Sequence, residues 1–165
     1  MSFNLHRAWV LMLMLFSSVS YAAYDPTDIK AVYIFRISNF IHWNSESEMT
    51  NIEFCIVGND KIASTLEKIT QDKTVRQLPL SVTPFYREQC DILFVDAKSE
   101  LNLADVLPHT VVISDNQSIG SQGGTIELAT LEGKVKPKIY MDNIGAYSIS
   151  SSLLRIAIIE DGEKI

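Results

Sequence analysis

The sequence predicts an α/β protein in which a mostly parallel sheet is covered on both faces. Three short and almost wholly apolar segments, residues 52–57, 92–95 and 110–114, are typical of buried parallel strands. Segments with apolar residues at helical spacing alternate with them, as connections between parallel strands require. With 165 residues, 47% hydrophobic and 21% charged, the chain has the length and composition of one globular domain.

The first helix is expected over residues 26–42. Pro26 suits a first helical turn, and Asp25 or Thr27 can cap it. Phe35 falls outside the apolar stripe of this segment, so it is either an exposed apolar contact or, as the simpler interpretation, packed under a neighbouring loop. The stripe itself consists of Ile29, Val32, Tyr33, Ile37, Phe40 and Ile41.

The middle of the chain continues the alternation of strand and helix. After the strand at 52–57 we expect a helix at 61–70 and a weaker strand at 80–83 between two prolines. After the strand at 92–95 we expect a short helix at 99–107, with Ser99 as its cap and Pro108 after its end. The strand at 110–114 completes this part of the predicted sheet.

The last third of the chain has a different pattern. A polar loop at 116–124 contains three glycines, and the segments 125–130 and 136–142 flank a turn at Glu132-Gly133. This pattern predicts an antiparallel hairpin. Residues 148–160 predict a closing helix, because their apolar residues recur at helical spacing at Ile149, Leu153, Ile156 and Ala157.

Residues 1–22 predict a secretory signal peptide. A short start carries Arg7 and no acidic residue, nine apolar residues follow at 8–16, and residues 17–22 are small or mildly polar. Cleavage is expected between Ala22 and Ala23, which leaves residues 23–165 as a single exported domain. The apolar run is shorter than the roughly 20 residues that span a bilayer, although an uncleaved anchor is the alternative.

The two cysteines, Cys55 and Cys90, both lie in the expected mature chain. An even number of cysteines in an exported protein predicts a disulfide, and two buried thiols are the alternative. Two cysteines are too few for a zinc centre of four cysteines.

The sequence lacks the local patterns of common catalytic and cofactor sites. His42 and His109 belong to no metal-binding motif, and there is no G-x-S-x-G elbow, phosphate-binding glycine loop or Cys-x-x-Cys. The formal net charge of −6 argues against general nucleic-acid binding, which needs clustered basic residues. We therefore expect no enzymatic activity, no metal and no cofactor.

Four polar residues lie at the ends of expected strands or directly after them: Asn59, Asp60, Asp96 and Asp115. Because the carboxyl ends of parallel strands border the ligand crevice of such sheets, these residues are the default candidates for a small-molecule pocket. The alternative interpretation is turn chemistry, since Asn and Asp are favoured in turns for their own local hydrogen bonds.

Several segments, taken in order, resemble the YfiR-like family of exported bacterial proteins. They are DIKAVYIFRISNFIHW, FCIVGND, CDILFV, GGTIELATLEGKVKPKIYMDNIGA and ISSSLLRIA, within residues 27–160. The last two are the most specific, because the glycines, the hairpin, Asn143 and Ala146 keep the family spacing. The chain departs from the family at Asn44, where proline is usual, and it has no counterpart of a second disulfide that some members carry near the hairpin.

This resemblance implies a Rossmann-like three-layer sandwich with a C-terminal hairpin and closing helix, and a stabilising disulfide between Cys55 and Cys90. It also implies a periplasmic protein that binds the periplasmic sensor domain of a membrane-bound diguanylate cyclase and represses it, lowering cyclic di-GMP and biofilm formation. An outer-membrane lipoprotein that sequesters the repressor, and a homodimer, are further expectations. The alternative function is a periplasmic small-ligand-binding accessory protein for a membrane sensor kinase.

Overall fold

The structure is a computed structural model and describes residues 25–161. The expected cleavage site at Ala22 and Ala23 lies outside the described residues. Among residues 25–161, no helix has the length and apolar character needed to cross a membrane.

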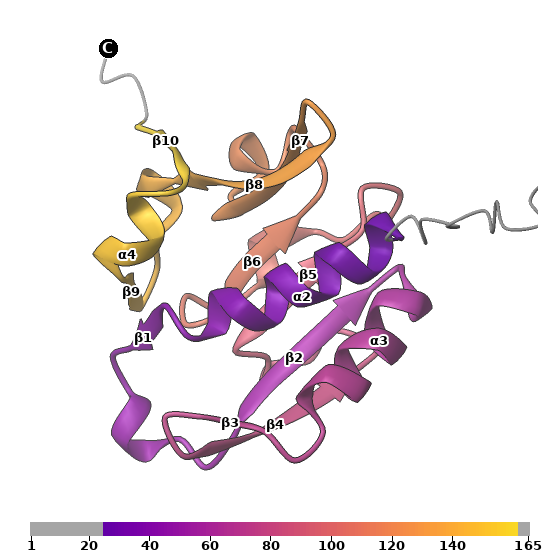
Figure 1. Ribbon diagram of the computed structural model, residues 1–165. Helices are drawn as coiled ribbons and strands as arrows, with labels where there is room; N and C mark the ends of the chain where they lie inside the picture. The colour runs from indigo at the N-terminus through magenta and orange to yellow at the C-terminus, as the bar shows by residue number, and fades with distance from the viewer. Residues whose placement is uncertain (1–24, 162–165) are drawn as a thin grey trace, which may run out of the picture.

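The centre of the fold is an eight-stranded mixed sheet (Figure 1). Five of its seven neighbouring strand pairs are parallel, and the other two are antiparallel. The α/β class and the mostly parallel sheet predicted from the sequence are therefore confirmed. In spatial order the strands are β10 (Ile158–Glu160), β8 (Lys134–Tyr140), β7 (Ile126–Leu131), β6 (Val111–Ser114), β5 (Ile92–Val95), β2 (Ile52–Val57), β4 (Leu78–Thr83) and β3 (Thr74–Val75).

Two helices, α2 (Pro26–Ser38) and α3 (Asp60–Thr70), pack side by side over one face of the sheet (Figure 1). Asp25 caps α2 by accepting a hydrogen bond from the Thr27 amide at 2.8 Å. Phe35 is partly buried and packs against the core, with the Lys73 ammonium of the loop after α3 lying 5.8 Å from its ring centroid. The simpler interpretation of Phe35 is thus confirmed.

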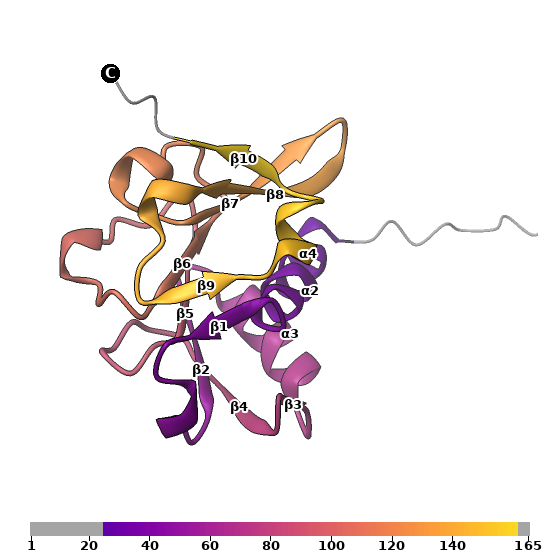
Figure 2. The same ribbon diagram turned by 90° about the vertical axis from the view of Figure 1, so that its left-hand side faces the viewer.

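The alternation of side chains along the strands divides the core into two parts. The even-numbered residues of β2, such as Phe54, face the helices, whereas Cys55 joins a smaller cluster on the opposite face with Leu93 and Val112. Loops, not long helices, cover this opposite face (Figure 2). The two faces of the sheet are therefore covered in different ways.

The helix predicted at 99–107 is wrong, since only a 3₁₀ turn, η3 (Leu103–Asp105), forms there. The Asn102 side chain accepts a hydrogen bond from the Ala104 amide and so starts the turn in the middle of the predicted helix. Pro108 follows too closely for a longer helix to form after that cap.

The helix predicted at 26–42 ends early, and its last residues form β1 (Ile41–Trp43) instead. This strand pairs antiparallel with β9 (Tyr147–Ile149), which replaces the first residues of the predicted closing helix (Figure 2). The remainder of that predicted helix is the single turn α4 (Ser151–Leu154) and the edge strand β10. The prediction failed because Tyr147 and Ile149 are buried by alternation along a strand, a pairing that helical periodicity cannot reveal.

The predicted hairpin is confirmed as the antiparallel pair β7 and β8. Glu132 and Gly133 form its turn, with φ of 50° and 73°. Positive φ at both central residues is what a tight two-residue turn between twisted strands requires.

Candidate functional site

Three of the four predicted crevice residues lie together at the carboxyl ends of β2, β5 and β6. Asn59 caps α3 by accepting a hydrogen bond from the Ile62 amide at 3.0 Å. Its amide group also donates to the Asp96 carboxylate at 2.8 Å. Asp96 in turn accepts a hydrogen bond from the Lys98 amide at 3.0 Å.

Asp115 is linked to this group by contacts with the loop after β5 and with α2. Its carboxylate accepts a hydrogen bond from the Ala97 amide at 2.8 Å and pairs with the Lys30 ammonium at 2.5 Å. No local sequence pattern indicated Lys30, because its part in the cluster depends on how α2 crosses the sheet.

The charge state of Asp96 reflects these contacts. Burial raises the pKa of Asp96, but hydrogen bonds from Asn59 and the Lys98 amide, with the charges of Lys30 and Lys98, outweigh burial and leave the pKa below its usual value. The carboxylate oxygens of Asp96 and Asp115 are thus already engaged by donors within the protein. This arrangement agrees with turn chemistry.

Asp60 does not join the cluster. It lies exposed in the first turn of α3, where a carboxylate interacts favourably with the helix dipole. It lines a hollow of about 290 Å³ between α3 and the end of β4. The four crevice candidates therefore fall into two separate places.

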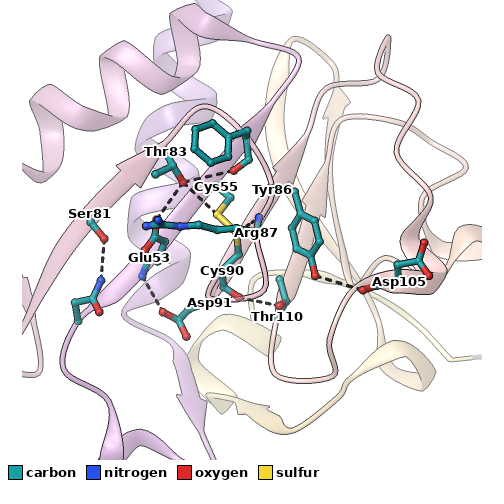
Figure 3. The surroundings of a disulfide bond; sticks show 12 residues. Glu53, Cys55, Ser81, Thr83, Tyr86, Arg87, Cys90, Asp91, Asp105 and Thr110 are labelled. Carbon is teal, nitrogen blue, oxygen red and sulfur yellow. Dashed lines mark hydrogen bonds and ion pairs between the residues drawn. A yellow bond between two sulfur atoms is a disulfide. The ribbon is translucent and has the colours of Figure 1, made fainter.

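A disulfide joins Cys55 of β2 to Cys90, just before β5, as the export argument and the resemblance lead one to expect (Figure 3). Both residues are fully buried, and their Cα atoms are 5.8 Å apart. The Thr110 hydroxyl donates to the Cys90 carbonyl at 2.7 Å, which ties the start of β6 to the same point. The disulfide therefore fixes the loop at 84–90 to the centre of the sheet.

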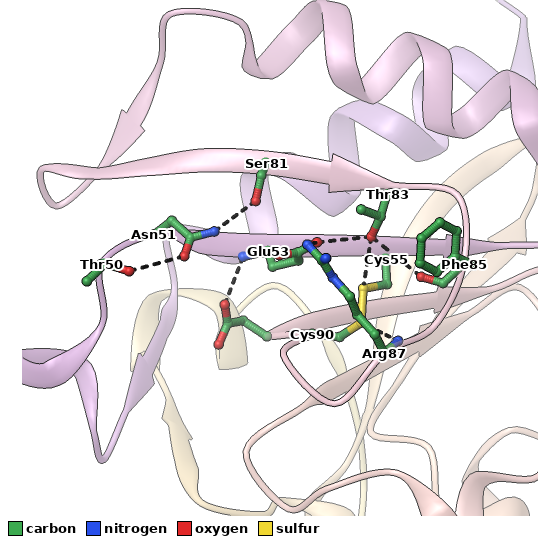
Figure 4. Close-up of polar contacts among 10 residues, drawn as sticks. Thr50, Asn51, Glu53, Cys55, Ser81, Thr83, Phe85, Arg87 and Cys90 are labelled. Atoms are coloured by element: carbon green, nitrogen blue, oxygen red, sulfur yellow. Dashed lines mark hydrogen bonds and ion pairs between the residues drawn. A yellow bond between two sulfur atoms is a disulfide. The ribbon is translucent and has the colours of Figure 1, made fainter.

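An ion pair between a buried glutamate and an exposed arginine lies beside the disulfide (Figure 4). Glu53 of β2 is 4% exposed, and its carboxylate pairs with the Arg87 guanidinium of the loop. It also accepts a hydrogen bond from the Thr83 hydroxyl at 3.1 Å. The Arg87 amide donates to the Cys90 sulfur at 3.2 Å, so the ion pair and the disulfide hold the same loop. A glutamate within the apolar segment 52–57 was the only sequence signal for this pair.

Among residues 25–161, Asp91 has a carboxyl group whose pKa lies above its usual value. Burial raises the pKa of Asp91 to about 6, although the hydrogen bond that it accepts from the Glu53 amide at 2.8 Å opposes that rise. The nearby Glu53 charge raises the pKa further, and His109 lowers it. Within the described chain, the cysteines are oxidised, and no group of three or more His, Cys, Asp or Glu residues is placed to hold a metal ion.

Asn143, which the sequence resemblance singled out, holds the glycine-rich loop at 116–124. Its side-chain amide donates to the carbonyls of Gly120 and Gly124, at 2.7 and 2.8 Å. The Thr125 hydroxyl donates to the Asn143 carbonyl at 3.2 Å and lies 2.6 Å from the Tyr147 hydroxyl. The residue therefore has a structural role at this point of the fold.

The described surface offers several large apolar side chains for contact with another molecule. Phe85, at the start of the loop held by the disulfide, is 56% exposed. The others are Leu107, Leu131, Ile156 and Ile159. The described residues thus combine polar clusters whose groups bond to one another with exposed apolar side chains.

Comparison with known families gives one match over most of the chain. A family model described as YfiR/HmsC-like matches residues 27–158. The matched segment runs from α2 to the first residue of β10 and includes both cysteines. No curated protein matches the chain.

Proposed function

Because this chain belongs to the YfiR/HmsC-like family, we propose that it is an exported regulatory protein of the bacterial periplasm. In this role it binds the periplasmic sensor domain of a membrane-bound diguanylate cyclase and represses the enzyme. Repression lowers cyclic di-GMP and with it biofilm formation. The family match over residues 27–158 is the observation that carries this proposal.

Two features of the described residues support a regulatory role in an oxidising compartment. The pairing of Cys55 with Cys90 is compatible with export, because disulfides persist in the periplasm and are rare in the cytosol. The polar groups at the strand ends bond to one another, so nothing in their geometry favours the small-ligand accessory role.

Repression by protein contact requires that the repressor distinguish two states of the cyclase. To shift the cyclase from 1:99 to 99:1 in favour of its inactive state, the repressor must bind that state about 10⁴-fold more tightly than the active one. A protein that bound both states equally would not change cyclase activity.

The test is deletion of the gene, with cyclic di-GMP measured in cell extracts by mass spectrometry. We expect the level to rise on deletion and to return when the full chain is restored. The matched control is a chain lacking residues 1–22, which stays in the cytoplasm and should not restore repression although it is produced at the same level. Unchanged cyclic di-GMP in the deletion strain would refute the proposal.

An outer-membrane lipoprotein that sequesters the repressor, and a homodimer, complete the proposed system. If the lipoprotein exists, its overproduction should raise cyclic di-GMP only in cells that contain this chain. Sedimentation of the purified mature protein at micromolar concentration should give the mass of a dimer, and a monomer mass would remove the homodimer from the proposal.

A further inference from the structure

The outer edge of β4 is mostly without a partner strand. β4 pairs with β2 along one side. On its other side the two-residue strand β3 pairs only with Leu78 and Pro79. Within the described residues, the segment 80–83 therefore has no strand on its outer side.

The hydrogen bonds of β2 show which of its backbone groups point toward β4. The amides of Asp91 and Asp96 donate to the carbonyls of Glu53 and Val57, at 3.0 and 2.9 Å. The odd-numbered residues of β2 thus direct their backbone groups toward β5 and its flanks. Because the direction alternates along a strand, the even-numbered residues direct theirs toward β4.

The register then gives the direction of the backbone groups of β4. Leu80 lies opposite Ile52, and Val82 lies opposite Phe54. In a parallel pair, a residue that hydrogen-bonds across the pair does so with the two neighbours of the residue opposite it. The opposite residue directs its own backbone groups away from the partner strand. The N–H and C=O groups of Leu80 and Val82 therefore point to the free edge.

A groove runs along this edge. Its main part, of about 960 Å³, lies between β4, the adjacent face of α3 and the turn at 71–74. It shares Ser64, Glu67 and Val82 with the 290 Å³ hollow that reaches Asp60 and Pro84. The hollowed surface thus follows the whole free edge from one end of β4 to the other.

The charges that line the groove differ between its two ends. At the carboxyl end of β4, Asp60 and Glu67 contribute two negative charges. The main part, toward the amino end, is lined by Lys68, Lys73, Asp72 and the shared Glu67, so its charges balance, and both lysines of the groove lie at this end. An extended chain lying in the groove would meet a net negative surface at the carboxyl end of β4 and two lysines, balanced by acidic residues, at the amino end.

The edge has few of the features that normally prevent strand addition, since the free segment is short and has a proline at each end but carries no charge. Native proteins protect free edges with charged residues, bulges or covering segments. Residues 80–83 carry no charge and include Val82 and Thr83, which favour strands, and only Pro79 and Pro84 limit the segment at its two ends.

We propose that the free edge of β4 binds an extended segment of a protein partner as an added strand. A basic side chain of that segment lies at the end with Asp60 and Glu67, and an acidic side chain lies at the end with Lys68 and Lys73. This site extends the proposed function by locating the contact with the partner. It rests on the proposed function only for the identity of that partner.

The test uses two synthetic seven-residue peptides and the purified mature protein. One peptide is Glu-Val-Thr-Val-Thr-Val-Lys, which fits the charges when it adds parallel to β4, and the other has the reverse order, which fits when it adds antiparallel. We expect one of them to slow amide hydrogen exchange at Leu80 and Val82 by at least about tenfold at saturation, because these amides gain hydrogen bonds.

Val82→Pro removes an amide that points to the groove and not to β2, so we expect it to lower peptide affinity at least about tenfold. The matched control Val82→Ala keeps the amide and should bind within about threefold of the unchanged protein, since only side-chain contact is lost. Equal binding by Val82→Pro, or no protection by either peptide, would overturn the proposal.

A change in the peptide tests the same contact without altering the fold. Methylation of the three valine amides or, separately, of the two threonine amides removes donors from opposite edges of the added strand. One pattern should abolish binding and the other should leave it intact, and equal effects would overturn the proposal. Failure of both peptides would leave the cyclic di-GMP result of the deletion strain unaffected, so the two proposals can fail separately.

Discussion

Replacing both cysteines by alanine should remove a large part of the stability of this protein. The disulfide joins residues 35 apart in sequence, and closing such a loop in the unfolded chain corresponds to about 4 kcal/mol at 25 °C. Both sulfur atoms are buried with Leu93 and Val112, so the Cys55→Ala/Cys90→Ala variant also leaves a small void. We therefore expect a loss of at least about 4 kcal/mol, or about 10–15 °C in Tm.

The assay is urea unfolding followed by the fluorescence of Trp43, the only tryptophan outside the expected signal peptide. Trp43 is 4% exposed and donates a hydrogen bond to the His109 carbonyl at 3.0 Å, so its emission should change on unfolding. The slope of the free energy of unfolding against urea should rise in the variant, because its unfolded chain is no longer cross-linked and exposes more surface.

The control is the unchanged protein unfolded in the presence of a reductant, which should approach the stability of the double variant. Without reductant, the unchanged protein should retain the full difference. A double variant within about 1 kcal/mol of the oxidised protein would refute the loop-closure reasoning for this disulfide.

Three further changes test the polar contacts of the fold by the same unfolding measurement. Asp91→Asn should be neutral at about pH 3.5 and more stable than the unchanged protein by about 1–2 kcal/mol at pH 7, after allowance for partial exposure. The sign follows because folding raises the pKa of Asp91 to about 6, so the unchanged protein loses stability as pH rises from about 4 to 6. Asn has no proton to lose, and equal pH dependence of stability in both proteins would contradict this. Arg87→Met should lower the free energy of unfolding by about 1–3 kcal/mol, because the buried Glu53 carboxylate loses its cation. Adding Glu53→Gln should recover part of that stability. No recovery would assign the loss to the packing of Arg87. Asn143→Ala should cost about 2–3 kcal/mol and speed proteolysis of the glycine-rich loop, because two carbonyl partners are lost, and an unchanged cleavage rate would argue against that role.

Local sequence features were sufficient for the elements whose burial is continuous or strictly periodic. The strand predicted at 110–114 differs from β6 by one residue, and the strands predicted at 52–57 and 92–95 have the bounds of β2 and β5. These segments are apolar on both faces, which only a central strand of a covered sheet requires. The hairpin of β7 and β8 was predictable for a similar reason, because its turn residues and flanking strands are neighbours in sequence.

The candidate site was predictable only in part. Asn59, Asp96 and Asp115 were expected at one edge from the parallel sheet alone, and they do lie together. Lys30 was not expected there, nor was the partnership of Glu53 with Arg87, which are 34 residues apart in sequence. Such pairs depend on the path of a helix or a loop over the sheet, and no local pattern in a single sequence records that path.

The sequence by itself determined the α/β class, the central strands, the hairpin and the two cysteines available for pairing, because hydrophobic periodicity, turn chemistry and cysteine count act locally. Only the tertiary structure determined which secondary structure residues 41–43 and 147–160 form. There the pairing of β1 with β9 buries Ile41 and Ile149, which helical spacing had assigned to helices, whereas β10 pairs with β8 as an exposed edge strand. The tertiary structure also decided that residues 80–83 have a free edge. The physical reason is that strand pairing satisfies backbone groups between segments distant in sequence, so its outcome depends on the whole fold.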